Sequence, residues 1–294
     1  MLTETMMCQT DIQASSTVRS LDAPELEKLY VHEVYDTIAE TFSASRYAPW
    51  PGVLRFLKSR PPGAWGADIG CGNGKYLVAA VKERVNILPM LASDSSVKLI
   101  NIVHERGFDG IAANLLSLPY RRGILDFFIC IAVLHHLATP ERRIEGIRVM
   151  ADLLRVGGEG LIQVWAKDQK WSGQPAVYVE KNESSATQCC NHSQQSENAV
   201  VFRDSTLSVQ KPRTPFVASD VLLPWNARKK GKYGAQTHCE DSTNSAVHNI
   251  NRYYHVFEKG ELENLISTIP CVKIVDCVYE QGNWSAIIRK IDSS

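Results

Sequence analysis

The sequence has no long run of apolar residues. No stretch reaches the roughly 18 apolar residues that a membrane-spanning helix needs, so no such helix and no membrane partner are predicted. Residues 1–20 are polar and lack the apolar core of a secretory signal peptide. We therefore expect a soluble intracellular protein, placed in the cytoplasm, with the nucleus left open as a second compartment.

An excess of one charge is also missing. The 32 Lys and Arg residues balance the 32 Asp and Glu residues, so the formal net charge at pH 7 is +0. No overall basic field indicates a nucleic-acid partner, and DNA is not expected. Cationic side chains do cluster within 142–148 and within 228–232, but a solvated surface would explain both clusters equally well.

Cysteine is present, but not in the patterns that hold metal ions. None of the eight cysteines forms a pair with the C-x-x-C spacing of zinc ligands, so we predict no metal site. Cys71 and Cys130 lie in segments predicted to be buried strand ends, whereas Cys189 and Cys190 are adjacent in a polar stretch. A disulfide framework is not expected in a chain of this size, which fits a reducing compartment.

Short apolar runs alternate regularly with amphipathic stretches in the middle of the chain. The predicted strands are 65–69, 85–93, 110–113, 125–133 and 159–165. The predicted helices between them are 75–82, 97–105 and 140–154. Strands that alternate with helices indicate a parallel sheet covered on both faces. A helix at 260–267 and two strands at 272–278 and 284–289 follow, and their short connection predicts an antiparallel hairpin at the sheet edge.

Changes in composition divide the chain into four parts. Two amphipathic helices, predicted at 25–42 and at 52–60, would form a lid over the sheet. A long polar stretch without any periodicity indicates an insertion that interrupts the domain. The expected boundaries are 1–24 for a disordered N-terminus, 25–167 for the core with its lid helices, 168–248 for a largely disordered insertion with an apolar island at 221–226, and 249–294 for the rest of the core.

The most specific motif is ADIGCGNGKYL at residues 67–77. A predicted strand enters its loop and a predicted helix leaves it, so a ligand would bind at a helix N-terminus. Gly70, Gly72 and Gly74 would let the backbone turn sharply and approach that ligand. The third glycine comes one residue too early for the G-x-G-x-x-G dinucleotide pattern, and Asp68 suits an ammonium group better than a pyrophosphate. The pattern resembles the first motif of class I methyltransferases, in which an acidic residue lies near the methionine ammonium group of the cofactor.

Three further positions are candidates for cofactor binding. Asp94 ends the second predicted strand about 20 residues past the glycines, where a carboxylate can accept both ribose hydroxyls. Asn114 follows the third strand, where class I methyltransferases usually have an Asp that reaches the adenine amino group. Its amide carbonyl can still accept that hydrogen bond. Leu115, next to Asn114, is the third candidate.

Several motifs outside the glycine loop point to one family. They are VHEVYDTIAETFSASRYAPWP from Val31, IAVLHHLATPERRIEGIRVM from Ile131, LIQVWA from Leu161, LLPWN from Leu222, RYYHVFEKGEL from Arg252 and QGNW from Gln281. Together they resemble the eukaryotic tRNA methyltransferases that esterify 5-carboxymethyluridine at the wobble position. The resemblance implies a Rossmann-like class I methyltransferase fold. It also implies a seven-stranded, mostly parallel sheet with helices on both faces, a C-terminal antiparallel hairpin and S-adenosylmethionine as the cofactor.

The implied reaction places a methyl group on a carboxylate and gives a methyl ester. A carboxylate with an ordinary pKa near ~4 is already ionised at neutral pH, so it needs no general base. Alignment and desolvation should then dominate catalysis. The site should offer donors to the carboxylate and aromatic faces to a base flipped out of the tRNA anticodon loop.

Candidates for these roles lie in the family motifs. Arg46 and Tyr47, in the lid, are catalytic candidates, and Arg46 would clamp the substrate carboxylate bidentately. His135 and His136 end the fourth strand, where neighbouring side chains point oppositely, so only His136 is expected to face the pocket. A surface ion pair for Arg46 and a structural role for His136 are the alternatives. The substrate-binding candidates, for which core packing is an alternative, are Trp165, Trp225, Arg252 and Tyr254.

The resemblance also implies two partners, the tRNA anticodon loop and a small zinc-binding activator subunit that forms a heterodimer with the methyltransferase. The subunit would pair along the edge strand 110–113, near Phe108 and Ile111, where an exposed apolar edge would otherwise favour aggregation. Two other functions remain open. A catalytically weak or inactive relative could serve as a scaffold or regulator, which Asn114, the long disordered insertion and the irregular Leu88-Pro89 segment would allow. A small-molecule methyltransferase is the other, although the lid and C-terminal motifs argue against it.

Overall fold

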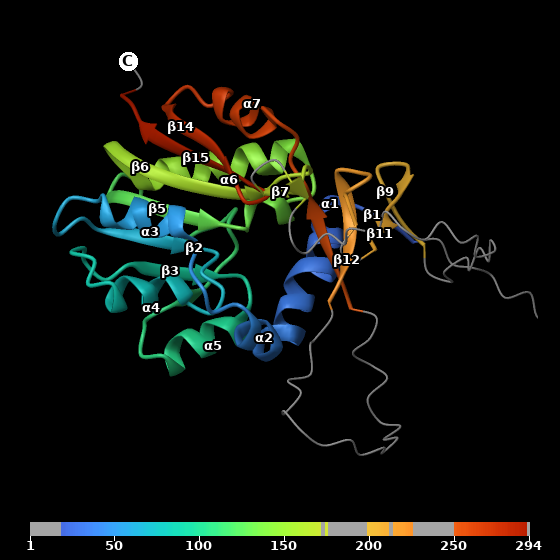
Figure 1. Cartoon of the computed structure of the whole chain (residues 1–294), viewed down its shortest axis with the longest axis horizontal. Helices are drawn as coiled ribbons and strands as arrows, with labels where there is room; N and C mark the ends of the chain where they lie inside the picture. The colour runs from blue at the N-terminus through green and yellow to red at the C-terminus, as the bar shows by residue number, and fades with distance from the viewer. Residues whose placement is uncertain (1–18, 172–173, 176–198, 212–213, 226–249, 293–294) are drawn as a thin grey trace, which may run out of the picture.

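A seven-stranded sheet lies at the centre of the molecule, with helices packed on both of its faces (Figure 1). In this computed structural model the described residues are 19–171, 174–175, 199–211, 214–225 and 250–292. The strand order is β14 (Val272–Glu280), β15 (Asn283–Lys290), β6 (Leu154–Trp165), β5 (Leu125–Ile131), β2 (Gly66–Ile69), β3 (Leu91–Asp94) and β4 (Ile111–Ala112). Of these seven strands, β15 alone runs opposite to the other six. The predicted fold, including the C-terminal hairpin, is confirmed.

The helices divide between the two faces of the sheet. One face carries α6 (Pro140–Leu153) and α7 (Glu261–Ser267), and the other carries α3 (Pro51–Lys58), α4 (Lys75–Lys82) and α5 (Val97–Glu105). Successive side chains of β5 point to opposite faces of the sheet, so this one strand packs against both helix layers. Phe128 packs in the cluster with α6 and α7, whereas Phe127 packs in the cluster with the other helices. Strands buried on both faces read as near-continuous apolar runs, as LDFFICI does.

Two of the predicted strands are shortened by local features of the backbone. The strand predicted at 85–93 contributes only β3, preceded by one isolated bridge between Ala64 and Ile87, because Pro89 cannot donate a ladder hydrogen bond. The strand predicted at 125–133 ends at Ile131. Ala132 has a φ of 61°, which turns the chain into the short 3-10 helix η2 (Leu134–His136). The helices α4 and α5 have the predicted bounds.

The helical lid at the N-terminus has a widened turn in its middle. It consists of α1 (Ala23–Glu27), the π-helical η1 (Lys28–His32) and α2 (Glu33–Ser45). Asp22 starts it with a capping box, because its side chain accepts from the Glu25 N–H while the Glu25 carboxylate faces the Asp22 N–H. From α2, Asp36 accepts hydrogen bonds from the Ser96 hydroxyl at 2.5 Å and the Lys98 N–H at 3.1 Å. These contacts fix α2 against the start of α5.

Short strands from the predicted N-terminal tail and insertion, together with β13, pair with one another, and most of them lie beside the lid (Figure 1). The pairs are β1 (Arg19–Leu21) with β9 (Val200–Phe202), β9 with β10 (Ser205–Thr206), β11 (Ser208–Val209) with β12 (Asp220–Pro224), β12 with β13 (Asn251–His255), and β7 (Lys170–Trp171) with β8 (Gln174–Pro175). Two of these strands were not expected to be disordered, since β12 corresponds to the predicted apolar island and β13 belongs to the predicted core. The expectation of disorder is wrong for the others. Leu21, Phe202 and Leu222 bury against Leu26 and Val31 of the lid, and that burial stabilises short strands.

The other positions of the two segments predicted to be disordered, 1–18, 172–173, 176–198, 212–213 and 226–248, lie outside the described residues. The apolar island at 221–226 is mostly accounted for by β12, which pairs with β13 from Asp220 opposite His255 to Pro224 opposite Asn251. None of the helices in the described ranges is long and apolar enough to cross a membrane.

Candidate active site

The glycine loop between β2 and α4 needs its glycines. Gly70, Gly72 and Gly74 have φ values of 73°, 56° and 71°, in the left-handed region that other residues rarely adopt. A Cβ on Gly70 would lie 2.2 Å from Cγ2 of Val133, and one on Gly72 would lie 3.4 Å from the Phe42 ring. The loop therefore packs closely against the end of β5 and against α2, and its backbone groups face the carboxyl edge of the sheet.

Asp68 is the buried anion of this loop. Its side chain is 1% exposed, and its Oδ2 has no hydrogen-bond partner. Burial raises the pKa of the carboxyl to about 7, although the nearby Lys75 ammonium opposes the shift. Burial likewise lowers the pKa of Lys75 to about 8. A cationic amino group would satisfy the free oxygen and stabilise the carboxylate, so Asp68 fits the ammonium group of S-adenosylmethionine.

The Asp94 side chain points toward the glycine loop. Its Oδ2 accepts the Gly72 N–H at 2.9 Å and its Oδ1 accepts the Ser96 N–H at 2.9 Å. Burial raises its pKa, while these two backbone donors act in the opposite direction. A carboxylate has about four lone-pair sites, so both oxygens can still accept hydroxyl donors. Asp94 therefore fits the ribose role, and it also fixes the loop itself.

Asn114 and Leu115, the remaining residues of the predicted cofactor site, are less available to a ligand. The side-chain oxygen Oδ1 of Asn114 accepts the N–H of Leu116 at 2.8 Å and so stabilises its own turn. Leu115 is 8% exposed and packs in the core beneath α6. The adenine contact predicted for Asn114 would have to share that carbonyl. The glycine loop, Asp68 and Asp94 are the groups that fit the cofactor best.

A second group of side chains gathers beyond the ends of β5 and β6. Trp165 and Tyr254 stack with ring centroids 4.8 Å apart and planes at 23°. The ring of His136 lies 4.6 Å from that of Tyr254, and Tyr35 of α2 lies 5.2 Å from His136. We call the group the aromatic cluster; its members are Tyr35, Phe42, His135, His136, Trp165, Trp225, Arg252 and Tyr254.

One row of hydrogen bonds runs through the aromatic cluster. Arg252 donates to the Tyr254 hydroxyl at 2.8 Å, and this hydroxyl lies 3.0 Å from that of Tyr35. The Tyr35 hydroxyl in turn lies 3.0 Å from Nε2 of His136, whose Nδ1 lies 2.9 Å from the Tyr253 carbonyl. A guanidinium only donates, a carbonyl only accepts, and the His136 ring, with its pKa lowered to about 3, carries a single proton, so the direction of the row is fixed. Each hydroxyl donates toward His136, and His136 donates through Nδ1.

His136 is therefore a structural member of the cluster. Burial lowers its pKa to about 3, so the ring is neutral, and both of its nitrogens are already engaged. Neither nitrogen is free to act on a substrate, which favours the structural alternative over a catalytic role. The expectation that only one of the two histidines faces the pocket is wrong. The chain at His135 and His136 is a 3-10 turn, not a strand, and their rings lie 4.5 Å apart.

Arg252 is a buried cation held between aromatic rings. It is 6% exposed, and its guanidinium carbon lies 4.8 Å from the centre of the Trp225 ring and 5.2 Å from that of Tyr254. Trp225 is fixed in turn, because its Nε1 donates to Thr41 at 3.1 Å. Within the described ranges, no carboxylate pairs with Arg252, and its Nε has no hydrogen-bond partner. The arrangement suits a planar anionic ligand.

Arg46 and Tyr47 lie elsewhere. Both are exposed, Tyr47 to 78%. The Arg46 carbonyl accepts from Asn73 at 3.0 Å, and its charge helps to lower the pKa of Lys75, so it lies beside the glycine loop. The clamp predicted for Arg46 stays a prediction, and Arg252 is the arginine found among the aromatic side chains.

The sequence analysis missed Tyr35, which connects α2 to the aromatic cluster. Its position in VHEVYDT carries a usable signal, because Tyr35 and Phe42 are seven residues apart and so share one helix face. Their rings meet edge-on at 5.4 Å.

Among the side chains that the structure describes, no group of three or more His, Cys, Asp or Glu is arranged to hold a metal ion. Cys71 and Cys130 are buried, and Cys189 and Cys190 lie outside the described residues.

Comparison with known proteins agrees with this geometry. Residues 67–162 match the family described as "Methyltransferase domain". A solved structure, the 1,6-didemethyltoxoflavin-N1-methyltransferase of Burkholderia thailandensis with its substrate and S-adenosylhomocysteine, aligns with a TM-score of 0.50 at 14% identity. The alignment covers 89% of this chain and 88% of that one. At this identity the likeness concerns the fold alone.

Two curated relatives are much more similar in sequence. The tRNA (carboxymethyluridine(34)-5-O)-methyltransferase alkbh8 of Xenopus tropicalis is 39% identical over 94% of this chain, which spans 43% of that protein. The tRNA (carboxymethyluridine(34)-5-O)-methyltransferase of Schizosaccharomyces pombe is 34% identical over 90% of this chain and 98% of its own length. With nearly the full length of the second relative covered, the chain belongs to the tRNA (carboxymethyluridine(34)-5-O)-methyltransferase family.

Proposed function

We propose that the protein transfers a methyl group from S-adenosylmethionine to the carboxylate of 5-carboxymethyluridine at the wobble position of tRNA. Its membership of the family supports this activity. So does the position of the two groups of side chains, because the glycine loop follows β2, while His135 follows the adjacent β5 and Trp165 ends β6. Ligands of such sheets bind at the carboxyl ends of the strands.

The observation that carries the proposal is the buried Arg252 guanidinium. In the part of the chain that the structure describes, it has aromatic neighbours and no acidic one. The carboxylate of the modified base would be its counter-ion, accepting from Nε, while Trp165 or Trp225 would offer a ring face to the uracil. Aromatic walls also exclude water, which strengthens the attraction between the two charges.

The chemistry needs few protein groups. S-adenosylmethionine, when bound, supplies a sulfonium methyl group that moves to an oxygen nucleophile without any proton transfer. The carboxylate uses a lone pair to form the O–C bond, and the S–C pair returns to sulfur. Asp68 and Asp94 would hold the amino and ribose ends of the cofactor, and Arg252 would align the carboxylate. Neutral His136 would keep Tyr35 and Tyr254 oriented.

The decisive experiment is methyl transfer from labelled S-adenosylmethionine to tRNA whose wobble uridine carries the carboxymethyl group. The same tRNA without that group is the matched control, and calorimetry measures cofactor binding separately. A methyl ester on the modified tRNA alone is the expected product. Cofactor binding without any turnover would instead favour the inactive scaffold, and transfer to free carboxylates but not to tRNA would favour a small-molecule methyltransferase.

The small zinc-binding activator remains our proposed partner, and its proposed site is the edge strand β4. This strand pairs with β3 on one side, and both of its residues are exposed, Ile111 to 45%. Phe108 is half-buried in the core on the α3–α5 face, so it would support the surface more than form it. An edge strand with an exposed apolar side chain is suited to pairing with a second chain. The compartment proposed with this function is the cytoplasm.

A further inference from the structure

The strand β13 uses its two sides for different purposes. Arg252 and Tyr254 face the aromatic cluster, as their contacts with Trp225 and Trp165 show. Tyr253 and His255 face the other way, because side chains alternate along a strand. Whatever holds Tyr253 and His255 therefore also fixes the side chains proposed to hold the substrate.

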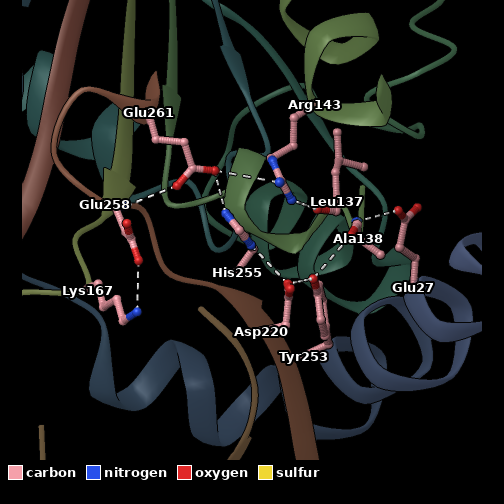
Figure 2. A network of polar contacts seen from close by, with 10 residues as sticks. All are labelled: Glu27, Leu137, Ala138, Arg143, Lys167, Asp220, Tyr253, His255, Glu258 and Glu261. Atoms are coloured by element: carbon pink, nitrogen blue, oxygen red, sulfur yellow. Dashed lines mark hydrogen bonds and ion pairs between the residues drawn. The ribbon is translucent and has the colours of Figure 1, made fainter. Parts of the chain in front are cut away.

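His255 lies between two carboxylates (Figure 2). Its Nδ1 is 2.9 Å from Oδ1 of Asp220 in β12, and its Nε2 is 2.6 Å from Oε1 of Glu261 in α7. An ionised carboxylate only accepts hydrogen bonds, so both ring nitrogens must carry a proton. The His255 side chain is 8% exposed, so water does little to screen its charge, whereas the side chains of Glu261 and Asp220 are 25% and 38% exposed.

The surrounding groups favour the ionised form of both carboxylates. The Tyr253 hydroxyl donates to Asp220, and an Arg143 nitrogen of α6 lies 3.7 Å from Glu261. The two cations, His255 and Arg143, balance the two carboxylates. Arg143 is itself held by the Leu137 carbonyl at 2.9 Å. The network thus ties β12, β13, α6 and α7 together without a net charge (Figure 2).

We propose that His255, held as an imidazolium between Asp220 and Glu261, is a positioning residue that fixes Arg252 and Tyr254 for the substrate carboxylate. The inference rests on the proposed function. A neutral His255 would turn a lone pair toward one of the two carboxylates, and the repulsion would push β12 or α7 away from β13. Substrate binding would weaken, while the glycine loop would be untouched.

The charges around the ring set the direction of the pH dependence. Burial lowers the pKa of His255, but hydrogen bonds to Asp220 and Glu261 outweigh it and the net shift is upward; Arg143 from α6 acts against them. The stabilisation is therefore fully present below the pKa of an ordinary imidazole and is lost as the pH rises through the higher folded value. Weaker tRNA binding is expected on the alkaline side.

Steady-state methyl transfer at saturating cofactor tests the inference. For His255→Gln, the KM for carboxymethylated tRNA should rise about tenfold near neutral pH, the size of one lost charge-assisted hydrogen bond, while kcat stays within about twofold. As the pH rises above the pKa of an ordinary imidazole and through the higher folded pKa of His255, the wild-type KM should climb toward that of the variant, which itself stays flat. Saturating cofactor keeps the titrations of Asp68 and Lys75 out of this comparison.

Two neighbouring glutamates provide a matched control. Glu261→Gln removes one carboxylate from His255. It should raise the tRNA KM and shift the alkaline rise of KM with pH to lower pH. Glu258→Gln changes a residue three positions earlier, 61% exposed and paired with Lys167 at 2.8 Å, and should leave KM and kcat unchanged. Equal effects of the two substitutions would overturn the proposal, as would a fall in kcat with KM intact.

Nitrogen NMR of the histidine rings tests the protonation state and the positioning role of His255 without any turnover. At neutral pH, His255 should show both nitrogens protonated, and its titration should shift the indole N–H signal of Trp225, which packs on Arg252. A neutral ring, or a Trp225 signal that ignores the titration, would contradict the positioning role. A wild-type protein that gives these signals but does not methylate the tRNA would contradict the proposed function alone.

Discussion

The guanidinium of Arg252 lies 4.8 Å from the centre of the Trp225 ring, although the two residues are far apart in the sequence. Trp225 directly follows β12 and Arg252 lies in β13, and the pairing of Leu223 with Arg252 brings them together. A cation on an aromatic face gains about 0.5–2 kcal/mol, depending on its desolvation. The contact orients the guanidinium and leaves Nε for a ligand.

Two arginines can be compared directly by the same substitution. Arg252→Met should lower kcat/KM for carboxymethylated tRNA by about a hundredfold, because a buried, charge-assisted contact is lost. Arg46→Met changes an exposed side chain beside the glycine loop and should lower kcat/KM by less than about tenfold. Calorimetry should find cofactor binding intact in both. A larger loss of kcat/KM for Arg46→Met than for Arg252→Met would indicate that Arg46, and not Arg252, binds the substrate carboxylate.

Cofactor binding should release a proton from Asp68. Burial raises the pKa of this carboxyl to about 7, and a bound ammonium group would lower it again. Calorimetry in buffers of different ionisation enthalpy should therefore show close to one proton released near pH 6 and little from this group at about pH 8.5. Asp68→Asn should abolish the release and weaken binding at least about tenfold.

The same residue links the pH to stability. A folded pKa raised from 3.8 to about 7 means that the ligand-free protein loses stability as the pH rises between those values. Asp68→Asn should remove this loss, so above pH 7 the variant should melt at a higher temperature than the wild type while binding the cofactor more weakly. A variant that melts lower at every pH would contradict the buried, unpartnered state of Asp68.

Gly70 and Gly63 separate backbone strain from steric overlap. Both have positive φ, 73° and 75°, but a Cβ on Gly63 meets nothing within 4 Å, whereas one on Gly70 overlaps Val133. Gly63→Ala should cost about 1–2 kcal/mol of unfolding free energy from φ alone. Gly70→Ala should cost a further 1–3 kcal/mol or so and should also impair cofactor binding. Denaturant titrations and calorimetry check both values.

Glu27 joins the lid to the start of α6. It is 1% exposed and accepts from Arg142 at 2.7 and 2.6 Å and from the Ala138 N–H at 2.8 Å. Glu27→Gln should lower the unfolding free energy by about 2 kcal/mol, because a charge-assisted pair is lost. Glu145→Gln, in a half-exposed pair with Arg148, should change it by less than about 0.5 kcal/mol. Equal losses in urea titrations would contradict this.

The proposed partner surface can be tested at one position. Ile111→Glu places a charge on the exposed edge of β4 and should abolish co-elution with the activator subunit in gel filtration. Because Ile111 is 45% exposed, the free protein should keep its melting temperature within about two degrees. Val278→Glu, which changes an exposed valine on the opposite edge strand β14, is the control and should leave co-elution intact.

The core of the fold could be predicted from local patterns. The bounds of α4 and α5 were predicted from apolar spacing and the glycine loop, and the turn at Gln281 and Gly282 indicated the final hairpin. Asp94 could be placed at the loop because strand ends in a parallel sheet meet at one edge. These features depend on short stretches of sequence.

The small strands could not be predicted, because their partners are distant. Val200–Phe202 is a three-residue apolar run in a polar segment, and its neighbour β1 lies some 180 positions earlier. The side-chain directions of Arg46 and His136 also depend on tertiary packing. One positive φ at Ala132 ended β5 two residues early and brought both histidines to the same side.

The burial of Arg252 has a consequence for the end of the catalytic cycle. Under the proposed reaction, an anion enters the cluster and a neutral methyl ester remains. The ester can no longer balance the guanidinium, and poor screening by water makes that difference large. The cation that binds the unmethylated carboxylate would therefore favour dissociation of the methyl ester. Turnover then does not require a separate conformational change to release the product.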